Sequence, residues 1–190
     1  MRINLPTWLT LFRVALLPVM VVAFYLPFPG HNITAAIVFL LAAFTDWLDG
    51  YLARRMNLTS AFGAFLDPVA DKLMVAVTLF LLVQENPTPL LAITSAVIVG
   101  REIAISALRE WMAEIGQRRH VNVAGLGKVK TVMQIVAIEV LLYQHDLVGL
   151  RPFFIGESLL VFAAALTIWS GLIYLRAAWP LLMRGERIDP

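Results

Sequence analysis

The chain has 190 residues, of which 60% are hydrophobic and only 15% are charged, and its formal net charge is +2. Soluble domains carry roughly 25% charged residues, so this composition indicates an integral membrane protein and excludes an ordinary soluble domain. The absence of cysteine excludes disulfide bonds, a thiol nucleophile and thiolate metal ligands.

Six stretches of the chain are long and apolar enough to form membrane-spanning helices, which need ~20 mostly apolar residues. Thr59 or Ser60 is expected to cap the third helix. The second half of the fourth is amphipathic, and a basic loop over 116–130 precedes the fifth. The expected spans cover residues 7–26, 33–53, 60–84, 90–115, 131–143 and 154–179. The predicted fold class is an all-α integral membrane protein with six transmembrane helices, forming a single domain over residues 1–190.

The positions of lysine and arginine predict the orientation of these spans. Six spans place both termini on the same side as the second-to-third and fourth-to-fifth connections. With that topology, every lysine and arginine except Arg151 falls on this one side. Cytoplasmic loops are enriched in lysine and arginine, so we expect both termini to be cytoplasmic.

Four aspartates interrupt the second and third apolar stretches. Asp46 and Asp49 are three residues apart, and Asp67 and Asp71 are four apart, so each pair lies on one face of its helix. The short connection makes the two helices antiparallel neighbours, and we expect the two faces to look at each other. Carboxylates inside a bilayer are costly unless they are paired, hydrated or bound to a cation. Oxygen ligands alone suit hard cations such as Mg²⁺, Mn²⁺ or Ca²⁺, so the pattern predicts a metal site.

Small residues accompany the aspartates and keep the helix surfaces low. They allow a planar or phosphate-bearing ligand, or another helix, to approach closely, and the sequence leaves both roles open. These residues are Gly50, Ala53, Gly63 and Ala64. Pro68 cannot supply the normal helical N–H, and a kink there is expected to aim Asp67.

Together these residues resemble the complete signature of the CDP-alcohol phosphatidyltransferase family. The pattern reads Asp46-x-x-Asp49-Gly50-x-x-Ala53-Arg54-(eight residues)-Gly63-x-x-x-Asp67-x-x-x-Asp71. Three further stretches are similar to bacterial members of the family that use glycerol 3-phosphate, namely NLPTWLTLFR, GREIAISALREWMAE and GLGKVKT. The resemblance covers most of the chain and is weakest from Gln144 to Ile155 and at the C-terminal tail.

The resemblance implies an enzyme that transfers the phosphatidyl group of CDP-diacylglycerol to sn-glycerol 3-phosphate, giving phosphatidylglycerophosphate and CMP. It implies a homodimeric bundle among the lipids of the bacterial cytoplasmic (inner) membrane, with a cytoplasmic active site and no nucleic-acid partner. Asp46, Asp49 and Asp67 would hold two divalent cations, Mg²⁺ or Mn²⁺, against the diphosphate. Asp71 would also contact metal and act as general base, taking the proton from the 1-hydroxyl group that attacks the β-phosphorus.

The same resemblance assigns residues to the nucleotide. The CDP-binding candidates are Thr10, Gly50, Ala53, Arg54 and Gly63. Thr7 and Arg13, in the opening motif, are also expected to face the nucleotide.

The phosphate of the acceptor needs fixed cations, because arginine and lysine are its natural partners. The candidates are Arg101, Arg109, Lys128 and Lys130, with Arg118 as a weaker one. We expect Glu102 and Glu110 to pair with neighbouring cations rather than coordinate metal. An alternative is that these cations anchor the chain to anionic lipid heads, which we prefer for Arg118 and Arg119.

Other functions remain open at this stage. Another member of the family, of the cardiolipin, phosphatidylserine or phosphatidylinositol-phosphate type, would share the metal site and differ in its acceptor. A cation-coupled transporter would distribute its carboxylates along a path and carry internal repeats; the clustered aspartates and the absence of a detectable repeat count against it. A catalytically inactive scaffold would have no need of all four aspartates.

Overall fold

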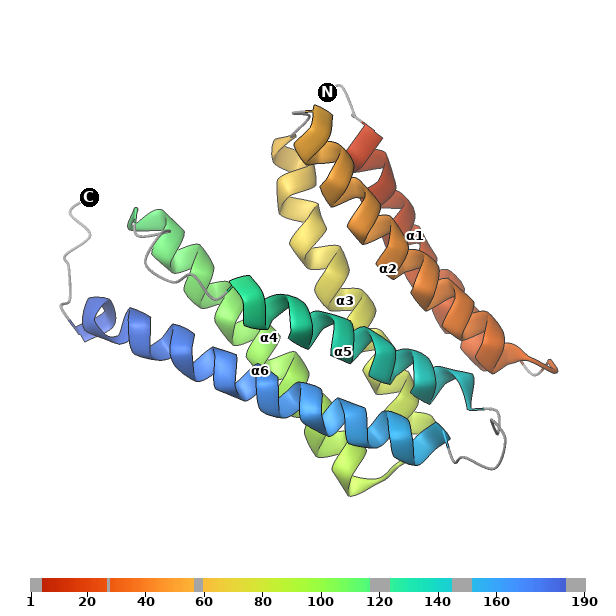
Figure 1. Cartoon of the computed structure of the whole chain (residues 1–190). Coiled ribbons are helices and arrows are strands. Elements are labelled where there is room, and N and C mark those ends of the chain that lie inside the picture. Colours follow the sequence, from red (N-terminus) through yellow and green to blue (C-terminus); the bar gives the residue numbers. More distant parts are fainter. Residues whose placement is uncertain (1–4, 27, 57–59, 117–123, 145–151, 184–190) are drawn as a thin grey trace.

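The computed structural model describes residues 5–26, 28–56, 60–116, 124–144 and 152–183. Over these residues the secondary structure is entirely helical, as predicted (Figure 1). The six helices are α1 Leu5–Tyr25, α2 His31–Met56, α3 Ala61–Glu85, α4 Pro89–Glu114, α5 Ala124–Tyr143 and α6 Pro152–Met183.

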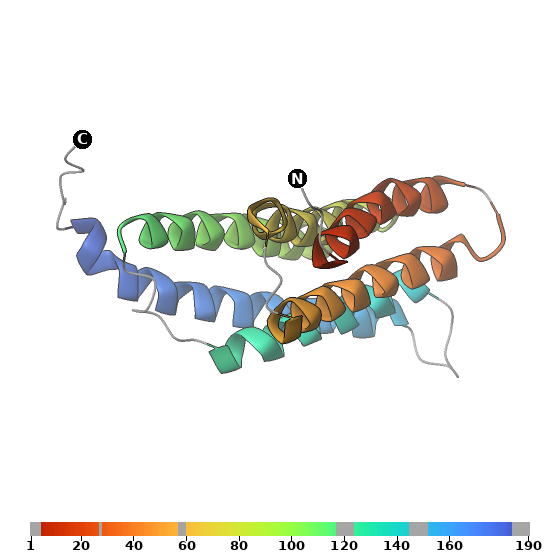
Figure 2. The same cartoon turned by 90° about the horizontal axis from the view of Figure 1, so that it is seen from above.

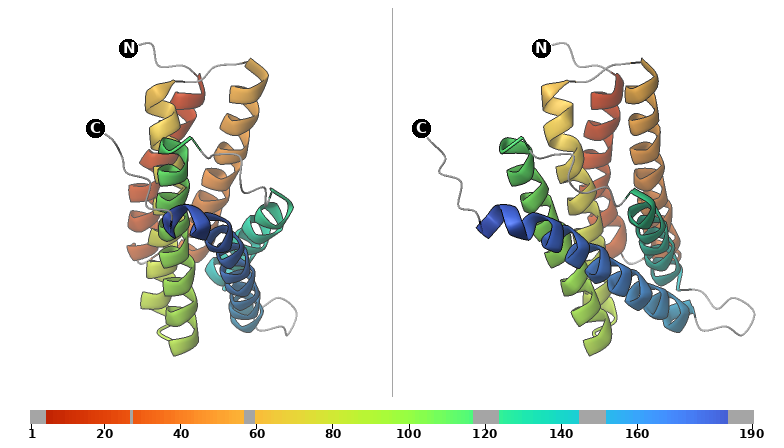
Figure 3. Two further views of the ribbon diagram at one scale, coloured as in Figure 1. Left: turned by 90° about the vertical axis from the view of Figure 1, so that its left-hand side faces the viewer. Right: turned by 60° about the vertical axis from the view of Figure 1, so that its left-hand side comes forward.

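The helices form two layers of three, which Figure 2 shows from above. One layer contains α1, α3 and α4 in that order, and the other contains α2, α5 and α6. Contacts of α1 with α2 and of α4 with α6 join the layers. In Figure 3, α6 crosses α4 obliquely, and the end of the bundle formed by the start of α1, the end of α2 and the start of α3 projects beyond α5 and α6.

Four helices among the described residues are long and apolar enough to cross a membrane: Thr7–Tyr25, His31–Ala53, Pro89–Glu114 and Pro152–Pro180. The other two helices, α3 and α5, are interrupted by charged residues. Large apolar side chains cover the outside of the bundle; Ile93, Phe162 and Trp169, for example, are each more than 60% exposed. Such a surface suits lipid acyl chains, and the chain is a multi-pass helical membrane protein.

The helix bounds agree with the expected spans to within four residues except at the start of α5. The expected basic loop over 116–130 is wrong in its second half, because α5 begins at Ala124. Gly125 and Gly127 favoured a loop, since each glycine costs about 1 kcal/mol in a helix interior. Packing of α5 against α6 and α2 outweighs this local preference. Lys128 and Lys130 therefore lie in a helix.

The apolar core lies where the two layers meet. Its most deeply buried members include Met20, Phe39, Leu82, Leu91, Ile138 and Leu160. Close approach of α5 and α6 depends on Gly156, where an added Cβ would lie 2.7 Å from Cγ of Leu141. This packing joins α5 and α6 within the layer that also contains α2.

Candidate functional site

The four aspartates converge on one side chain, the guanidinium group of Arg13 in α1. Nη2 of Arg13 lies 2.5 Å from Oδ2 of Asp49. Nη1 lies 3.0 Å from Oδ1 of Asp46 and 3.2 Å from Oδ1 of Asp67. It also donates a hydrogen bond to Asp71. Arg13 is only 2% exposed and its pair with Asp49 is buried, whereas the side chains of Asp46, Asp67 and Asp71 are each more than 40% exposed.

The position of α1 corrects one expectation from the sequence. The helices α2 and α3 are antiparallel, as expected (Figure 1), but α1 contacts both of them far more extensively than they contact each other. The aspartate pairs thus meet across Arg13. The sequence suggested a nucleotide-facing role for Arg13 and missed this contact. The available signal was an arginine inside an apolar span, because such charges pair with others.

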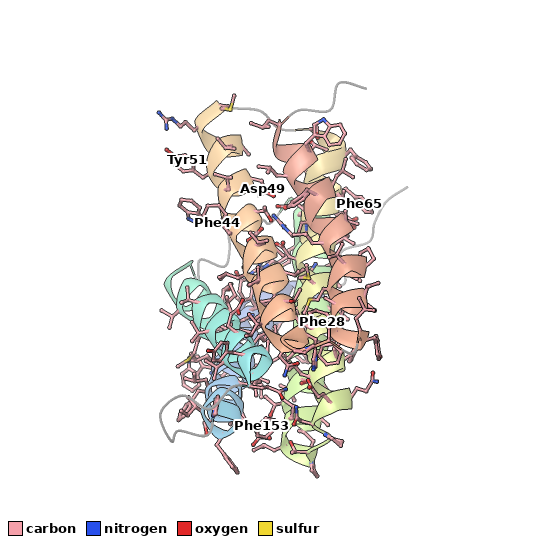
Figure 4. All side chains as sticks on the ribbon, turned by 90° about the vertical axis from the view of Figure 1, so that its right-hand side faces the viewer. Phe28, Phe44, Asp49, Tyr51, Phe65 and Phe153 are labelled. Carbon is pink, nitrogen blue, oxygen red and sulfur yellow. The ribbon has the colours of Figure 1, made fainter. Side chains whose placement is uncertain are left out.

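Helical spacing places the signature residues of α2 on a common face. Asp46, Asp49, Gly50 and Ala53 follow the i, i+3, i+4, i+7 pattern of one helix stripe. Figure 4 shows Asp49 between α2 and α1, whereas Phe44 and Tyr51 lie on the outer side of α2. Asp49 is the most buried of the four aspartates.

The chemistry of this cluster fits divalent cations. One carboxylate oxygen from each of Asp46, Asp49 and Asp67 lies within 4.8 Å of the other two. Carboxylate oxygens at such separations match the ligand set of Mg²⁺ or Mn²⁺. With Asp71 and Arg13 included, four formal negative charges face one positive charge, so the cluster keeps a net charge that favours further cations.

Gly63, a predicted nucleotide residue, has a packing role in this structure. Ser60 caps α3, as predicted for Thr59 or Ser60, and its Oγ accepts a hydrogen bond from the Gly63 N–H at 2.9 Å. The hydroxyl groups of Ser60 and Thr7 are also hydrogen-bonded, at 2.8 Å. A Cβ on Gly63 would lie 2.9 Å from Ser60 Oγ and 3.0 Å from Thr7 Oγ1. The glycine therefore lets α3 approach α1, whatever else it contacts.

The remaining nucleotide candidates lie on the same side of the bundle. Thr10 is buried in α1, one turn before Arg13. Gly50 and Ala53 are half-buried on the stripe of α2 that carries the aspartates. The side chain of Arg54 lies outside the described part of the chain.

Among the described residues two cavities are lined by members of the cluster, and a third is lined by Pro68 and Lys72, which directly follow Asp67 and Asp71. A cavity of about 110 Å³ is lined by Arg13, Asp46, Asp71 and Gln134 among others. A second, of about 370 Å³ and mostly apolar, extends from Asp71 to Glu102 between α3, α4 and α5. A third, of about 430 Å³, lies between α3, α4 and α6 and is more polar.

Lys72 lines both larger cavities. The sequence interpretation passed over this residue, although it directly follows Asp71. On the opposite wall of the 430 Å³ cavity lies Arg109, with its guanidinium 4.8 Å from the ring centre of Tyr174 and Nη2 3.1 Å from the Tyr174 hydroxyl oxygen. Two cations thus line the more polar of the two larger cavities.

Arg101 and Lys130 are tied to protein groups. Lys130 is 5% exposed and pairs with Glu102, as predicted for that glutamate. Nη2 of Arg101 donates to Ser170 Oγ at 2.7 Å, and Nη1 lies 3.7 Å from Glu102 Oε1. Gly171 provides the room, because a Cβ there would lie 3.2 Å from Nε of Arg101. Arg118 and the side chain of Lys128 lie outside the described residues.

Comparisons with known proteins find matches over most of the chain. Residues 3–169 match the family model described as CDP-alcohol phosphatidyltransferase. A protein of Yersinia pestis (strain Pestoides F) is 52% identical over 184 residues, covering 96% of this chain and 99% of the relative. One from Sodalis glossinidius is 52% identical over 94% of this chain and 96% of its own length. One from Salmonella choleraesuis is 48% identical over the full length of both. All three are named CDP-diacylglycerol–glycerol-3-phosphate 3-phosphatidyltransferase.

Proposed function

Because the chain belongs to the CDP-alcohol phosphatidyltransferase family, we propose that it transfers the phosphatidyl group of CDP-diacylglycerol to sn-glycerol 3-phosphate. The products are phosphatidylglycerophosphate and CMP. The choice of acceptor follows the names of the relatives that match over nearly their whole length. The observation that carries the reaction type is the convergence of four carboxylates from two helices on one buried point.

The proposed reaction uses divalent cations. The residues proposed to hold them are Asp46, Asp49, Asp67 and Asp71. When bound, two such ions polarise the diphosphate and neutralise the charge that develops on departing CMP. Thr10, Gly50, Ala53, Arg54 and Gly63 remain the proposed surroundings of the CDP group.

Asp71 is the proposed general base. It lines the 370 Å³ cavity and the small cavity beside Arg13, and the next residue, Lys72, lines the 430 Å³ cavity. It accepts the proton of the acceptor's 1-hydroxyl group. The oxygen then bonds to the β-phosphorus, and the bond from that phosphorus to the oxygen of CMP breaks.

The two larger cavities suit the two substrates. The 370 Å³ cavity has apolar walls, including Leu73, Val99 and Ile103, which suit an acyl chain of the lipid donor. The 430 Å³ cavity has Lys72 and Arg109 on its walls, which suit the phosphate of the acceptor. Arg101 and Lys130 pair with Glu102, which lines the 370 Å³ cavity rather than the 430 Å³ one. They remain proposed acceptor residues, together with Lys128 and Arg118, on the ground of the sequence.

The same site supports a proposal for the membrane arrangement. We propose that all six helices cross the bacterial cytoplasmic (inner) membrane and that the end of the bundle with the start of α1 faces the cytoplasm. Soluble glycerol 3-phosphate and CMP then exchange with the cytoplasm, whereas the lipids stay in the bilayer. A homodimer is proposed from the resemblance to the family.

The test is an assay of CMP release by the purified protein in mixed micelles with CDP-diacylglycerol and Mg²⁺. Parallel reactions contain sn-glycerol 3-phosphate, glycerol, serine, inositol phosphate or phosphatidylglycerol as acceptor. We expect release with glycerol 3-phosphate and a phosphatidylglycerophosphate product by mass spectrometry. Preference for another alcohol would indicate a different member of the family. Absence of release with every acceptor would contradict the reaction itself.

A further inference from the structure

One nitrogen of the Arg13 guanidinium group, Nη1, contacts more carboxylates than its two hydrogens can serve. Nη1 carries two hydrogens, yet oxygens of three aspartates, Asp46, Asp67 and Asp71, lie within hydrogen-bonding distance of it. Nε, on the same side chain, is buried and has no hydrogen-bond partner. The planar guanidinium group therefore has too many acceptors around Nη1 and none at Nε.

Such crowding is typical of a position that suits a spherical cation better than a guanidinium group. Carboxylates from α2 and α3 surround Nη1 from several directions, whereas arginine binds best to one carboxylate through two parallel hydrogen bonds. A divalent ion accepts oxygens from any direction and supplies twice the charge. The point occupied by Nη1 is thus the place where the four carboxylates most strongly favour a metal ion.

Space for an alternative position of the guanidinium lies next to it. The 110 Å³ cavity is lined by Arg13 together with Asp46 and Asp71; its other walls are mainly apolar, and Gln134 offers a polar partner among them. Arginine reaches such a space by rotating its side-chain torsions, without movement of α1. The charge can therefore leave the carboxylates and stay beside them.

We propose that Arg13 is a resident counterion, which holds the four carboxylates together until divalent cations displace its guanidinium group from them. The proposal rests on the aspartates being the cation site of the proposed function. It assigns Arg13 a positioning role. One side chain stabilises the bundle without metal and competes with the metal for the same oxygens.

Removing Arg13 should therefore lower the stability of the metal-free protein and raise its affinity for the cation. Without Arg13, the four clustered carboxylates repel one another and the buried Asp49 loses its partner, so the metal-free protein loses stability. Arg13 raises the apparent dissociation constant of the divalent cation, because only the fraction of protein with free carboxylates can bind it. Removing Arg13 should therefore make the cation bind more tightly. A residue with only a packing role lowers stability and does not tighten metal binding.

The experiment uses the full chain in detergent, with Arg13→Gln as the variant. Free Mn²⁺ is measured by electron paramagnetic resonance, and thermal unfolding is followed with EDTA and with saturating Mn²⁺. In EDTA we expect Tm to fall by about 10 °C, the order of loss for breaking a buried ion pair such as Arg13 with Asp49. We expect the Kd for Mn²⁺ to fall about tenfold, which corresponds to a guanidinium that holds the carboxylates about 90% of the time.

Arg101→Gln is the matched control, because Arg101 is also a poorly exposed arginine in a helix with an unpartnered Nε. It contacts Ser170 and Glu102 and none of the four aspartates. We expect it to lower Tm and to leave Mn²⁺ affinity unchanged. If Arg13→Gln does not remain folded in EDTA, Arg13→Lys is used instead. We then expect smaller decreases in both Tm and the Kd for Mn²⁺.

A second variant separates charge from packing. Asp46→Asn in the Arg13→Gln background removes one repelling charge, so the double variant should regain part of the lost Tm in EDTA. Mn²⁺ affinity equal to or weaker than wild type in Arg13→Gln would overturn the proposal, as would a double variant less stable than either single one. If neither wild type nor Arg13→Gln binds Mn²⁺, the proposed cation site itself fails.

Discussion

Lys130 of α5 and Glu102 of α4 form an ion pair across the interior of the bundle, next to the cavity that Asp71 lines. Lys130 is 5% exposed, so its ammonium group has little access to water and depends on this carboxylate. The pair links the two helices that carry most of the proposed acceptor side.

Glu102→Gln should therefore destabilise the protein. Removing one partner of a buried pair leaves an uncompensated charge and costs about 3–5 kcal/mol. Lys130→Met in the same background should recover much of that loss, because no buried charge is then left alone. Thermal unfolding of the single and double variants in detergent measures both changes. Additive losses in the double variant would contradict a direct pair.

Gly63→Ala should also lower stability. Its new Cβ would press on Ser60 and Thr7, both within 3.0 Å, and force α3 away from α1 at a cost of about 1–3 kcal/mol. Gly100→Ala is the matched control in α4, where nothing lies within 4 Å of the added Cβ. That change should be neutral or slightly stabilising, because alanine is the better helix former. Equal Tm values for the two variants would refute the packing role.

Asp71→Asn should abolish measurable turnover while the protein still binds CDP-diacylglycerol. A general base contributes roughly 10²–10⁴-fold to the rate, and the amide cannot accept the proton. CMP release measures turnover, and Tm with and without Mg²⁺ reports whether the cluster still takes up cations. Activity within tenfold of wild type would remove Asp71 from the role of base.

Lys72→Met and Arg109→Met should raise KM for glycerol 3-phosphate about tenfold or more and change KM for CDP-diacylglycerol little. Each loses a charge-assisted contact to the acceptor's phosphate, which contributes about 1.5–3 kcal/mol. Arg55→Met is a suitable control, because Arg55 is exposed and pairs with Tyr51 on the outer side of α2. An increase confined to the lipid substrate would show that these cations serve the donor.

Much of the fold was readable because helices in a bilayer are specified locally. Length and hydropathy located six helices, with most bounds within four residues, and the spacing of Asp46, Asp49, Asp67 and Asp71 predicted two carboxylate faces. The start of α5 was mispredicted because the low helix propensity of Gly125 and Gly127 is a local signal. Packing of α5 against α6 and α2 overrode it.

The contacts that organise the site depend on segments far apart in the chain. Arg13 precedes Asp49 by 36 residues and Asp71 by 58, and no pattern in the sequence specifies that α1 lies against both α2 and α3. The pairing of Lys130 with Glu102 and the exposure of Lys72 to two cavities depend in the same way on helix packing. Residue type and periodicity thus establish which groups face inward on each helix. Only tertiary packing decides which of those groups meet, because partners are chosen by the relative placement of whole helices.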